Sequence, residues 1–185
     1  MKRKHTKNKE GIGCNLYFRT NVFKVNTAYL LLGSNIGERE KNLSLALKFL
    51  KTEAGTVYKK SAIYSTKAWG NETMDDFLNR AVCMKTKLSA AKLLKAVLKI
   101  ESGMGRKRQQ RKYLPRTIDI DILFFNDEII NSGELKIPHP LLHQRKFALV
   151  PMAEIAPGFV HPVFHKTISF LLSACEDTLS VAKIN

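Results

Sequence analysis

The sequence predicts an α+β fold, a ferredoxin-like βαββαβ sandwich with a helical and β appendix at its C-terminal end. Three observations predict it: short runs rich in β-branched and aromatic residues, two segments with the apolar periodicity of amphipathic helices, and the order in which the two kinds alternate. The 185 residues suit one domain with its own core. We expect a flexible basic extension over residues 1–25 and one folded domain over 26–185.

The first half of this domain is predicted to contain a strand, a helix and two further strands. Residues 27–32 form an apolar, strand-like run. Asn35 is of a type that caps helices, and we expect it to begin a helix over about 37–53. Strands follow over 57–64 and 77–87, with a loop between them. The apolar face of the helix is predicted to consist of Leu43, Leu45, Ala46, Leu47, Phe49 and Leu50.

The second half adds a helix, a strand and the appendix. Ser89 is predicted to cap a helix that closes near Gly103 or Gly105. Residues 117–125 alternate acidic with β-branched residues and end in aromatics, which indicates a strand. The appendix, 126–185, is predicted to hold a proline-rich turn over 137–140 and helical segments near 142–154 and 167–175. The second helix has an apolar face formed by Leu93, Leu94, Val97, Leu98 and Ile100.

The net charge of +15 is concentrated in two short segments. Residues 1–25 hold seven Lys or Arg residues against the single acid Glu10, and residues 106–116 hold six without an acid. Each segment contributes +6, so together they supply twelve of the fifteen charges. Such a balance indicates a polyanionic partner: nucleic acid, a membrane surface or a phosphorylated small molecule. The charge therefore lies mainly on a tail and a loop and does not form a continuous basic face on the domain.

The compartment can be predicted from what the sequence lacks. No stretch approaches the ~20 apolar residues of a membrane span, and Arg19 and Lys24 interrupt any hydrophobic region that a signal peptide needs. Cys14, Cys83 and Cys175 are far apart and odd in number, which fits neither a disulfide framework nor a zinc site. We expect a cytoplasmic protein with reduced thiols.

Asp119 and Asp121 lie in the middle of the hydrophobic run 117–125. Side chains alternate along a strand, so both carboxylates are predicted to share one face. Two uncompensated carboxylates on an apolar strand cost several kcal/mol if they are buried, so something cationic must meet them. One candidate is a salt bridge with the neighbouring arginines. The other is Mg²⁺, a hard ion that takes one or two carboxylates together with substrate phosphates, and the spacing suits even two such ions.

The basic loop favours the second candidate. Six cations just before the acidic strand could surround a triphosphate whose metals are held by the two aspartates. Arginine makes bidentate contacts with phosphate oxygens that lysine cannot make, so Arg106, Arg108 and Arg116 are the stronger candidates. The sequence contains no Gly-Lys-Ser/Thr phosphate-binding loop, so a nucleotide site would have to be built from arginines and metals.

These motifs resemble those of the 6-hydroxymethyl-7,8-dihydropterin pyrophosphokinase family. The most specific is Pro115-Arg116-Thr117-Ile118-Asp119-Ile120-Asp121, preceded by Glu101 and Arg106-Lys107-Arg108. The resemblance covers about residues 27–160 in unbroken order. Its weaker matches are Leu32-Gly33-Ser34-Asn35, Tyr64-Ser65-Thr66, Phe77-Leu78-Asn79, Ile137-Pro138-His139-Pro140 and Arg145-Lys146-Phe147.

The resemblance implies transfer of pyrophosphate from Mg-ATP to 6-hydroxymethyl-7,8-dihydropterin, releasing AMP, in folate biosynthesis. It implies that Asp119 and Asp121 hold two Mg²⁺ ions. It assigns catalysis to Arg106, Arg108 and Arg116 as well as to the aspartates. It implies ATP contacts for Glu101, Arg106, Arg116, Ile122, His139 and Arg145. It implies pterin contacts for Thr66, Phe77, Asn79 and Phe147, and Trp69 lies in the loop beside them.

The expected partners are thus ATP and the pterin, with no nucleic acid and no membrane, and the protein is expected to be a monomer. Two rival readings stay open: a ferredoxin-like RNA-binding module, suggested by the charge and the fold, and a non-catalytic sensor of pterin or nucleotide. Some positions depart from the family pattern, which puts loop conformation and nucleotide affinity in question. The departures are Lys67, Lys112, Tyr113, Leu114 and Glu134.

Overall fold

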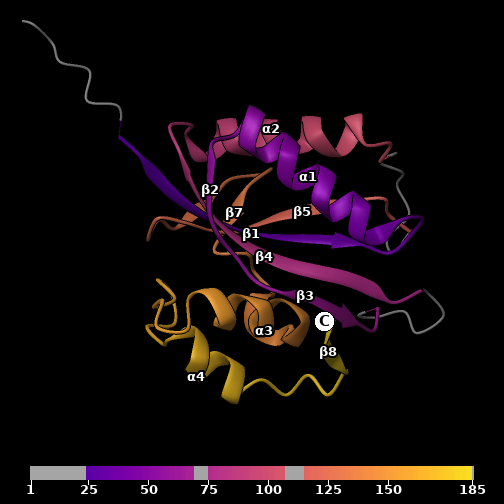
Figure 1. The fold of residues 1–185 in the computed structure, drawn as a ribbon. Helices are drawn as coiled ribbons and strands as arrows, with labels where there is room; N and C mark the ends of the chain where they lie inside the picture. Colours follow the sequence, from indigo (N-terminus) through magenta and orange to yellow (C-terminus); the bar gives the residue numbers. More distant parts are fainter. Residues whose placement is uncertain (1–23, 69–74, 107–114, 185) are drawn as a thin grey trace, which may run out of the picture.

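The computed structural model describes residues 24–68, 75–106 and 115–184. It is a mixed α/β fold in which an antiparallel sheet lies between two layers of helices (Figure 1). The strands of the main sheet are β1 (Asn26–Ser34), β2 (Thr56–Lys60), β3 (Ile63–Thr66), β4 (Phe77–Thr86), β5 (Asp119–Phe125) and β8 (Val181–Ile184). The other elements are α1 (Arg39–Glu53), α2 (Ala90–Gly103), the two-stranded sheet of β6 (Ile130–Asn131) and β7 (Lys136–Ile137), the 3-10 helix η1 (Leu142–Gln144), α3 (Lys146–Ile155) and α4 (Ile168–Ser173).

The order of the strands across the main sheet is β5-β1-β4-β3-β8, and β2 also pairs with β4. Every neighbouring pair is antiparallel. Strand β1 lies between β4 and β5, so Gly33 is opposite both Asn79 and Asp119. This register brings residues that are 46 and 86 positions downstream of Gly33 to one line across the sheet.

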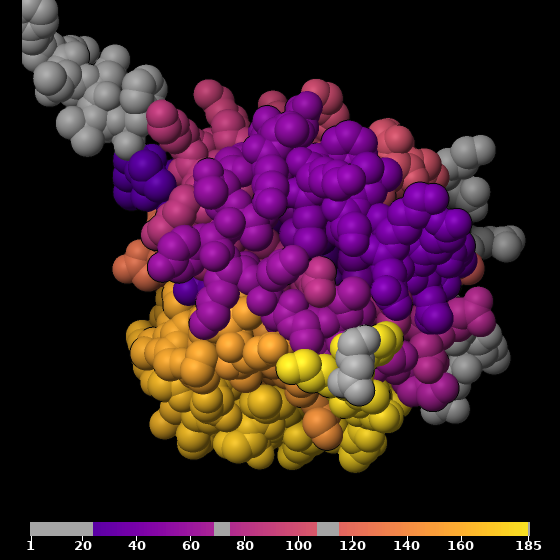
Figure 2. All heavy atoms as spheres, in the orientation of Figure 1, coloured from indigo at the N-terminus to yellow at the C-terminus, as the bar shows by residue number. Residues whose placement is uncertain are grey.

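Two hydrophobic cores fill the space on either side of the sheet. α1 and α2 cover one face and pack on Leu30, Leu32 and Ile120, while α3 and α4 cover the other face and pack on Leu31 and Phe124. In the space-filling view the C-terminal part, orange and yellow, forms a separate layer below the indigo and magenta part (Figure 2). The appendix thus completes the sandwich.

The helix predicted over 37–53 is present, but Asn35 does not cap it. α1 begins at Arg39 with Glu38 as its N-cap, and no side chain caps it there. The Asn35 side chain instead bonds the backbone of Arg116, which lies 81 residues away. On the predicted apolar face, Leu45 and Phe49 are exposed, because the helix buries a narrower stripe of Leu43, Ala46, Leu47 and Leu50.

The single strand predicted over 57–64 is wrong: the chain forms two strands, β2 and β3, that break at Ser61 and Ala62. The break is fixed by α3, because Glu154 accepts hydrogen bonds from the Ala62 N–H (3.0 Å) and the Tyr64 hydroxyl (2.9 Å). This contact depends on the appendix, which local sequence patterns do not place.

The predictions for the second helix and the acidic strand are confirmed. The Ser89 hydroxyl accepts a hydrogen bond from the Lys92 N–H, and Gly105 takes a positive φ of 89° beyond the C-terminal end of α2. β8, the C-terminal strand, was not predicted and pairs with β3. The predicted extension falls almost wholly on residues 1–23, outside the described part of the chain. Among the described residues, no helix has the length and apolar character to cross a membrane.

Candidate active site

The two aspartates of β5 share one face of an edge strand, as predicted. Asp119 is opposite Gly33 and Asp121 is opposite Leu31 on β1, and these partners lie two residues apart. Ile120 and Ile122 alternate with the acids and are buried in the core under α1 and α2. The alternation of the sequence therefore turns the carboxylates away from that core.

The Asp119 carboxylate is held between two arginines. The Arg106 guanidinium donates to one of its oxygens and the Arg116 guanidinium to the other. Burial alone would raise the pKa of Asp119, but Arg116 and Arg106 lower it below its ordinary value. Asp119 is thus ionised at neutral pH, and the salt bridge weighed above is present for this residue.

Glu101 organises the same cluster from α2. Its side chain is 2% exposed, and Oε1 accepts hydrogen bonds from Arg106 and from the Ile120 backbone N–H (2.8 Å). Burial alone would lower the pKa of Arg106, but Asp119 and Glu101 raise it above its ordinary value. Glu101 thus fastens α2 to β5 and orients Arg106 toward Asp119.

Asp121 has a different environment. No hydrogen bond or ion pair to its carboxylate is found among residues 24–68, 75–106 and 115–184. Burial and the neighbouring Asp119 carboxylate raise its pKa to about 7, against a smaller opposing effect of Arg145. A cation with oxygen ligands would remove this penalty, so the pair fits a Mg²⁺ ion. The described residues contain no group of three or more His, Cys, Asp or Glu that could hold a metal, so further ligands would have to come from a substrate or water.

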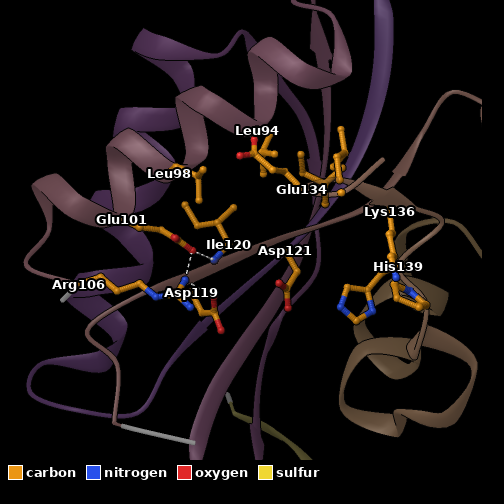
Figure 3. Close-up of a pocket in the computed structure, with 14 residues that line it drawn as sticks. Leu94, Leu98, Glu101, Arg106, Asp119, Ile120, Asp121, Glu134, Lys136 and His139 are labelled. Atoms are coloured by element: carbon orange, nitrogen blue, oxygen red, sulfur yellow. Dashed lines mark hydrogen bonds and ion pairs between the residues drawn. The ribbon is translucent and has the colours of Figure 1, made fainter. Parts of the chain in front are cut away.

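A cavity of about 290 Å³ opens beside the aspartates (Figure 3). Its polar end holds Asp119, Asp121, Arg106 and His139, and residues of α2 and of the β6–β7 hairpin line the rest. Leu94 and Leu98 form an apolar wall on α2, on the same side of that helix as Glu101. The remaining lining residues are Glu101, Ile120, Ile122, Gly133, Glu134, Leu135, Lys136 and Pro140.

His139 is a neutral imidazole at physiological pH. Burial and the nearby Arg145 cation lower its pKa to about 4. Its Nδ1 accepts a hydrogen bond from the Leu141 N–H (3.3 Å), so the ring proton is on Nε2. The backbone N–H of His139 is bonded to the Leu123 carbonyl (3.0 Å), which fastens the residue to β5. His139 can therefore donate a hydrogen bond at the polar end of the cavity without adding a charge.

A second group of predicted residues lies across β1, on the same face of the sheet as the aspartates. Asn79 is opposite Gly33 on β4, and its Nδ2 donates to the Thr66 hydroxyl on β3 (2.7 Å). A Cβ atom on Gly33 would lie 2.8 Å from Asn79 Oδ1 and 3.6 Å from the Phe77 ring. The absence of a side chain at Gly33 thus makes room for Asn79 and Phe77 beside the acidic strand.

Phe147 is placed in the first turn of α3. It packs partly buried against the core under α3 and α4, with the Arg145 guanidinium 5.6 Å from its ring centroid. No ring contact joins it to Phe77 in the described part of the chain. Arg145 and Arg116 do not line the cavity. The Arg116 guanidinium bonds Asp119, which does line it.

Arg108 and Trp69, both predicted site residues, lie outside the described residues. Leu94 and Leu98 were predicted only as part of an apolar helix face. Glu101 lies on the same face of α2 as these two leucines. An acid on an apolar helix face was the signal that this part of the face borders a polar site.

A carboxylate pair flanked by arginines at the polar end of a cavity is typical of enzymes that transfer phosphoryl groups from nucleotides. The chain belongs to the family of 7,8-dihydro-6-hydroxymethylpterin-pyrophosphokinase (HPPK), whose profile matches residues 29–157.

Curated relatives agree with this membership. The chain is similar to a 2-amino-4-hydroxy-6-hydroxymethyldihydropteridine pyrophosphokinase of Aquifex aeolicus, with 42% identity over 142 residues, 77% of this chain and 88% of the relative. The corresponding protein of Bacillus subtilis is 47% identical over 131 residues, 70% of this chain and 78% of the relative. Among solved structures, Plasmodium falciparum HPPK-DHPS with pteroate has a TM-score of 0.67 at 19% identity. That likeness covers 82% of this chain but only 44% of the solved chain, and it shows the fold alone.

Proposed function

We propose that the protein transfers the β,γ-pyrophosphoryl group of ATP to the hydroxymethyl oxygen of 6-hydroxymethyl-7,8-dihydropterin, giving the pterin diphosphate and AMP for folate biosynthesis. The observation that carries this proposal is the pair Asp119 and Asp121 at the polar end of a cavity, with Arg106 and His139 beside them. Family membership, at 42% and 47% identity to pyrophosphokinases of this name, supports the reaction.

ATP is proposed to lie along the cavity. The apolar wall of Leu94 and Leu98 suits a purine base, and Ile122 and Glu101 also line the cavity. The triphosphate would then meet the polar end, where Arg106 and the His139 Nε2–H can bond its oxygens. Arg116 and Arg145 are proposed to add charge from outside the cavity, and Arg108 to complete the phosphate contacts.

Asp119 and Asp121 are proposed to hold two Mg²⁺ ions together with ATP. Bound Mg²⁺ neutralises the phosphate charge and aligns the reacting groups. The raised pKa of Asp121 favours this assignment, since a buried carboxylate that forms no ion pair with the described residues gains most from a bound cation. Arg106 and Arg116 pair with Asp119 in the structure and are proposed to turn toward phosphate oxygens when ATP is bound.

The pterin is proposed to bind across β1 from the aspartates. Asn79 and Thr66 carry the polar groups that fix the edge of a flat heterocycle, and Phe77 offers an aromatic face. Phe147 and Trp69 are proposed as further aromatic contacts. The line Asp119, Gly33, Asn79 across three strands supports this arrangement, because the residues proposed to meet the two substrates lie on either side of β1.

In the reaction, the hydroxymethyl oxygen attacks the β-phosphorus. The bond from this phosphorus to the α–β bridging oxygen breaks, AMP departs with that oxygen, and the hydroxyl proton is lost to solvent. The arginines stabilise the charge that develops on the leaving oxygen. The lowered pKa of Asp119 makes it a weak base, so positioning of the two substrates supplies much of the rate in this proposal.

The same proposal covers the arrangement of the chain. We infer that residues 26–185 form one catalytic domain, that the sheet order β5-β1-β4-β3 is that of a ferredoxin-like sandwich, and that 1–25 is an accessory extension. We also infer a cytoplasmic monomer without nucleic-acid or membrane partners.

The test is AMP formation from ATP, measured with and without the pterin. Wild-type protein is expected to form AMP only when both substrates and Mg²⁺ are present. Asp119→Ala and Asp121→Ala are expected to lose more than about 90% of kcat, a loss above ~1.4 kcal/mol, while remaining folded. A folded variant that keeps more than about a tenth of the wild-type kcat would contradict the metal assignment. AMP formation without the pterin would contradict the proposed reaction.

A further inference from the structure

Two asparagines fasten the two ends of the β1–β5 pair with the same bonds. At the end far from the site, the Asn126 N–H donates to the Thr27 carbonyl (2.7 Å) and Asn126 Oδ1 accepts from the Thr27 N–H (2.9 Å). At the site end, the Asn35 N–H donates to the Arg116 carbonyl (3.1 Å) and Asn35 Oδ1 accepts from the Arg116 N–H (2.6 Å). Each asparagine thereby holds both polar backbone groups of one distant residue.

Asn35 is itself fixed in place. It is 2% exposed and directly follows β1. On either side of it, Asn42 of α1 donates from Nδ2 to the Ser34 hydroxyl (3.2 Å) and the Ile36 carbonyl (3.0 Å). The Nδ2 of Asn35 is buried and has no hydrogen-bond partner among the residues that the structure describes. The side chain of Asn35 is therefore oriented by its bond to Arg116.

This clamp acts on the backbone that carries a charged site residue. The β1–β5 ladder ends at the pair Gly33 and Asp119, so Arg116 lies three residues before the first rung of β5. Its guanidinium nevertheless pairs with Asp119. A long side chain meets a fixed target only if its own backbone is fixed, and small misplacements of such groups cost large factors in rate.

We propose that Asn35 is a positioning residue that sets Arg116 against the reacting phosphates. The proposal rests on the proposed function, in which Arg116 binds ATP. Asn35 bonds the backbone of Arg116, so in this proposal its effect passes through the Arg116 side chain. Asn126 is the matched control, because it makes the same two bonds between the same strands away from the site.

The experiment compares wild type, Asn35→Ala, Asn126→Ala, Arg116→Ala and the double variant Asn35→Ala/Arg116→Ala. Steady-state kcat and KM for each substrate are measured together with urea unfolding. Asn35→Ala is expected to lower kcat/KM for ATP by about tenfold, and to add less than about twofold once Arg116 is already alanine. Asn126→Ala is expected to stay within about twofold of wild type in kcat/KM, whatever stability it loses.

Three results would overturn the proposal. The first is an Asn35→Ala variant with the same kcat/KM as Asn126→Ala. The second is a double variant whose loss of kcat/KM equals the product of the losses in Asn35→Ala and Arg116→Ala. If Asn35→Ala does not fold, Asn35→Asp, which keeps an acceptor oxygen for the Arg116 N–H, takes its place. It is expected to keep kcat/KM within about threefold of wild type, and a loss of tenfold or more would be the third result. Wild-type protein that forms no AMP at all would instead remove the proposed function, which separates the two failures.

Discussion

The carboxylates of Asp119 and Asp121 share one face of β5, yet only Asp119 forms ion pairs with arginines among the residues that the structure describes. Arg106 and Arg116 lower the pKa of Asp119, while burial and Asp119 itself raise that of Asp121 to about 7. Among the described residues, one acid is therefore paired within the protein, and we expect the other to be compensated by a bound cation. This asymmetry gives the pair its predicted response to cations and to pH.

Asp121→Asn is expected to stabilise the protein without substrates. The folded pKa of about 7 lies above the ordinary value near 3.9, so the wild type loses stability as pH rises from about 4 to 7. The uncharged amide avoids this loss, and the gain at pH 8 should be roughly 1–3 kcal/mol, shrinking toward pH 4. Urea unfolding at pH 4.5 and pH 8 measures it. Mg²⁺ with ATP should stabilise the wild type more than the variant, and an equal response of both would count against Asp121 as a ligand.

Gly33→Ala is expected to disrupt pterin binding while the fold persists. The added Cβ would lie 2.8 Å from Asn79 Oδ1, so the amide has to move away from the Thr66 hydroxyl that it bonds. The pterin Kd should rise at least about tenfold, with the ATP Kd within about twofold. Calorimetric titration of each ligand measures both. Gly158→Ala is the control, since its added Cβ would have no atom within 4 Å in the described residues other than those of its chain neighbours. Unchanged pterin affinity in Gly33→Ala would displace the proposed pterin site.

Phe77→Ala and Phe147→Ala are expected to differ in stability but not in the ligand they affect. Both should weaken pterin binding by roughly 1–3 kcal/mol through lost stacking and burial, with little change in ATP binding measured alone. Phe147 also packs against the core under α3 and α4, so its replacement should lower the Tm more than that of Phe77. Ligand titrations and thermal unfolding give the two readouts. Normal pterin binding by both variants, with lowered Tm, would show that these rings serve only the core.

His161 is expected to make the protein sensitive to acid. It is 3% exposed, and burial together with His143 and His165 lowers its pKa to about 4. The unfolded chain binds a proton near pH 6.5 that the folded protein does not, so stability is lost as pH falls from about 6.5 to 4. His161→Asn keeps an acceptor for the Val163 and Phe164 N–H groups and should reduce this loss by roughly 1–3 kcal/mol at pH 4.5. If the free energy of unfolding of the two proteins changes equally between about pH 6.5 and 4, His161 is not the source of the acid sensitivity.

The sheet and its two aspartates could be predicted because the signals are local. Alternation of acids with Ile120 and Ile122 defines both the strand and the face that its carboxylates occupy, and Ser89 caps α2 through a hydroxyl only three residues from its partner. The secondary structure of these segments is therefore determined mainly by their own residues.

What sequence could not predict depends on long-range contacts. Asn35 was given a local role as a helix cap, but its partner is Arg116, on another segment of the site. The break between β2 and β3 depends on Glu154 of α3, and β8 pairs with β3 across the sheet edge. Local patterns do not encode such partners. The sequence offered the salt bridge of Asp119 with neighbouring arginines as one of two candidates, but not the bonds by which Glu101 of α2 joins Arg106 and the β5 backbone.

The fate of the γ-phosphorus of ATP distinguishes pyrophosphoryl transfer from transfer of a single phosphate. Wild-type protein is incubated with Mg²⁺, the pterin and ATP labelled at that position, and the products are separated and counted. Pyrophosphoryl transfer predicts that the label appears on a pterin carrying two phosphates, with one unlabelled AMP formed for each labelled pterin and no ADP. ADP as the nucleotide product, or label released without a pterin diphosphate, would contradict pyrophosphoryl transfer at this site.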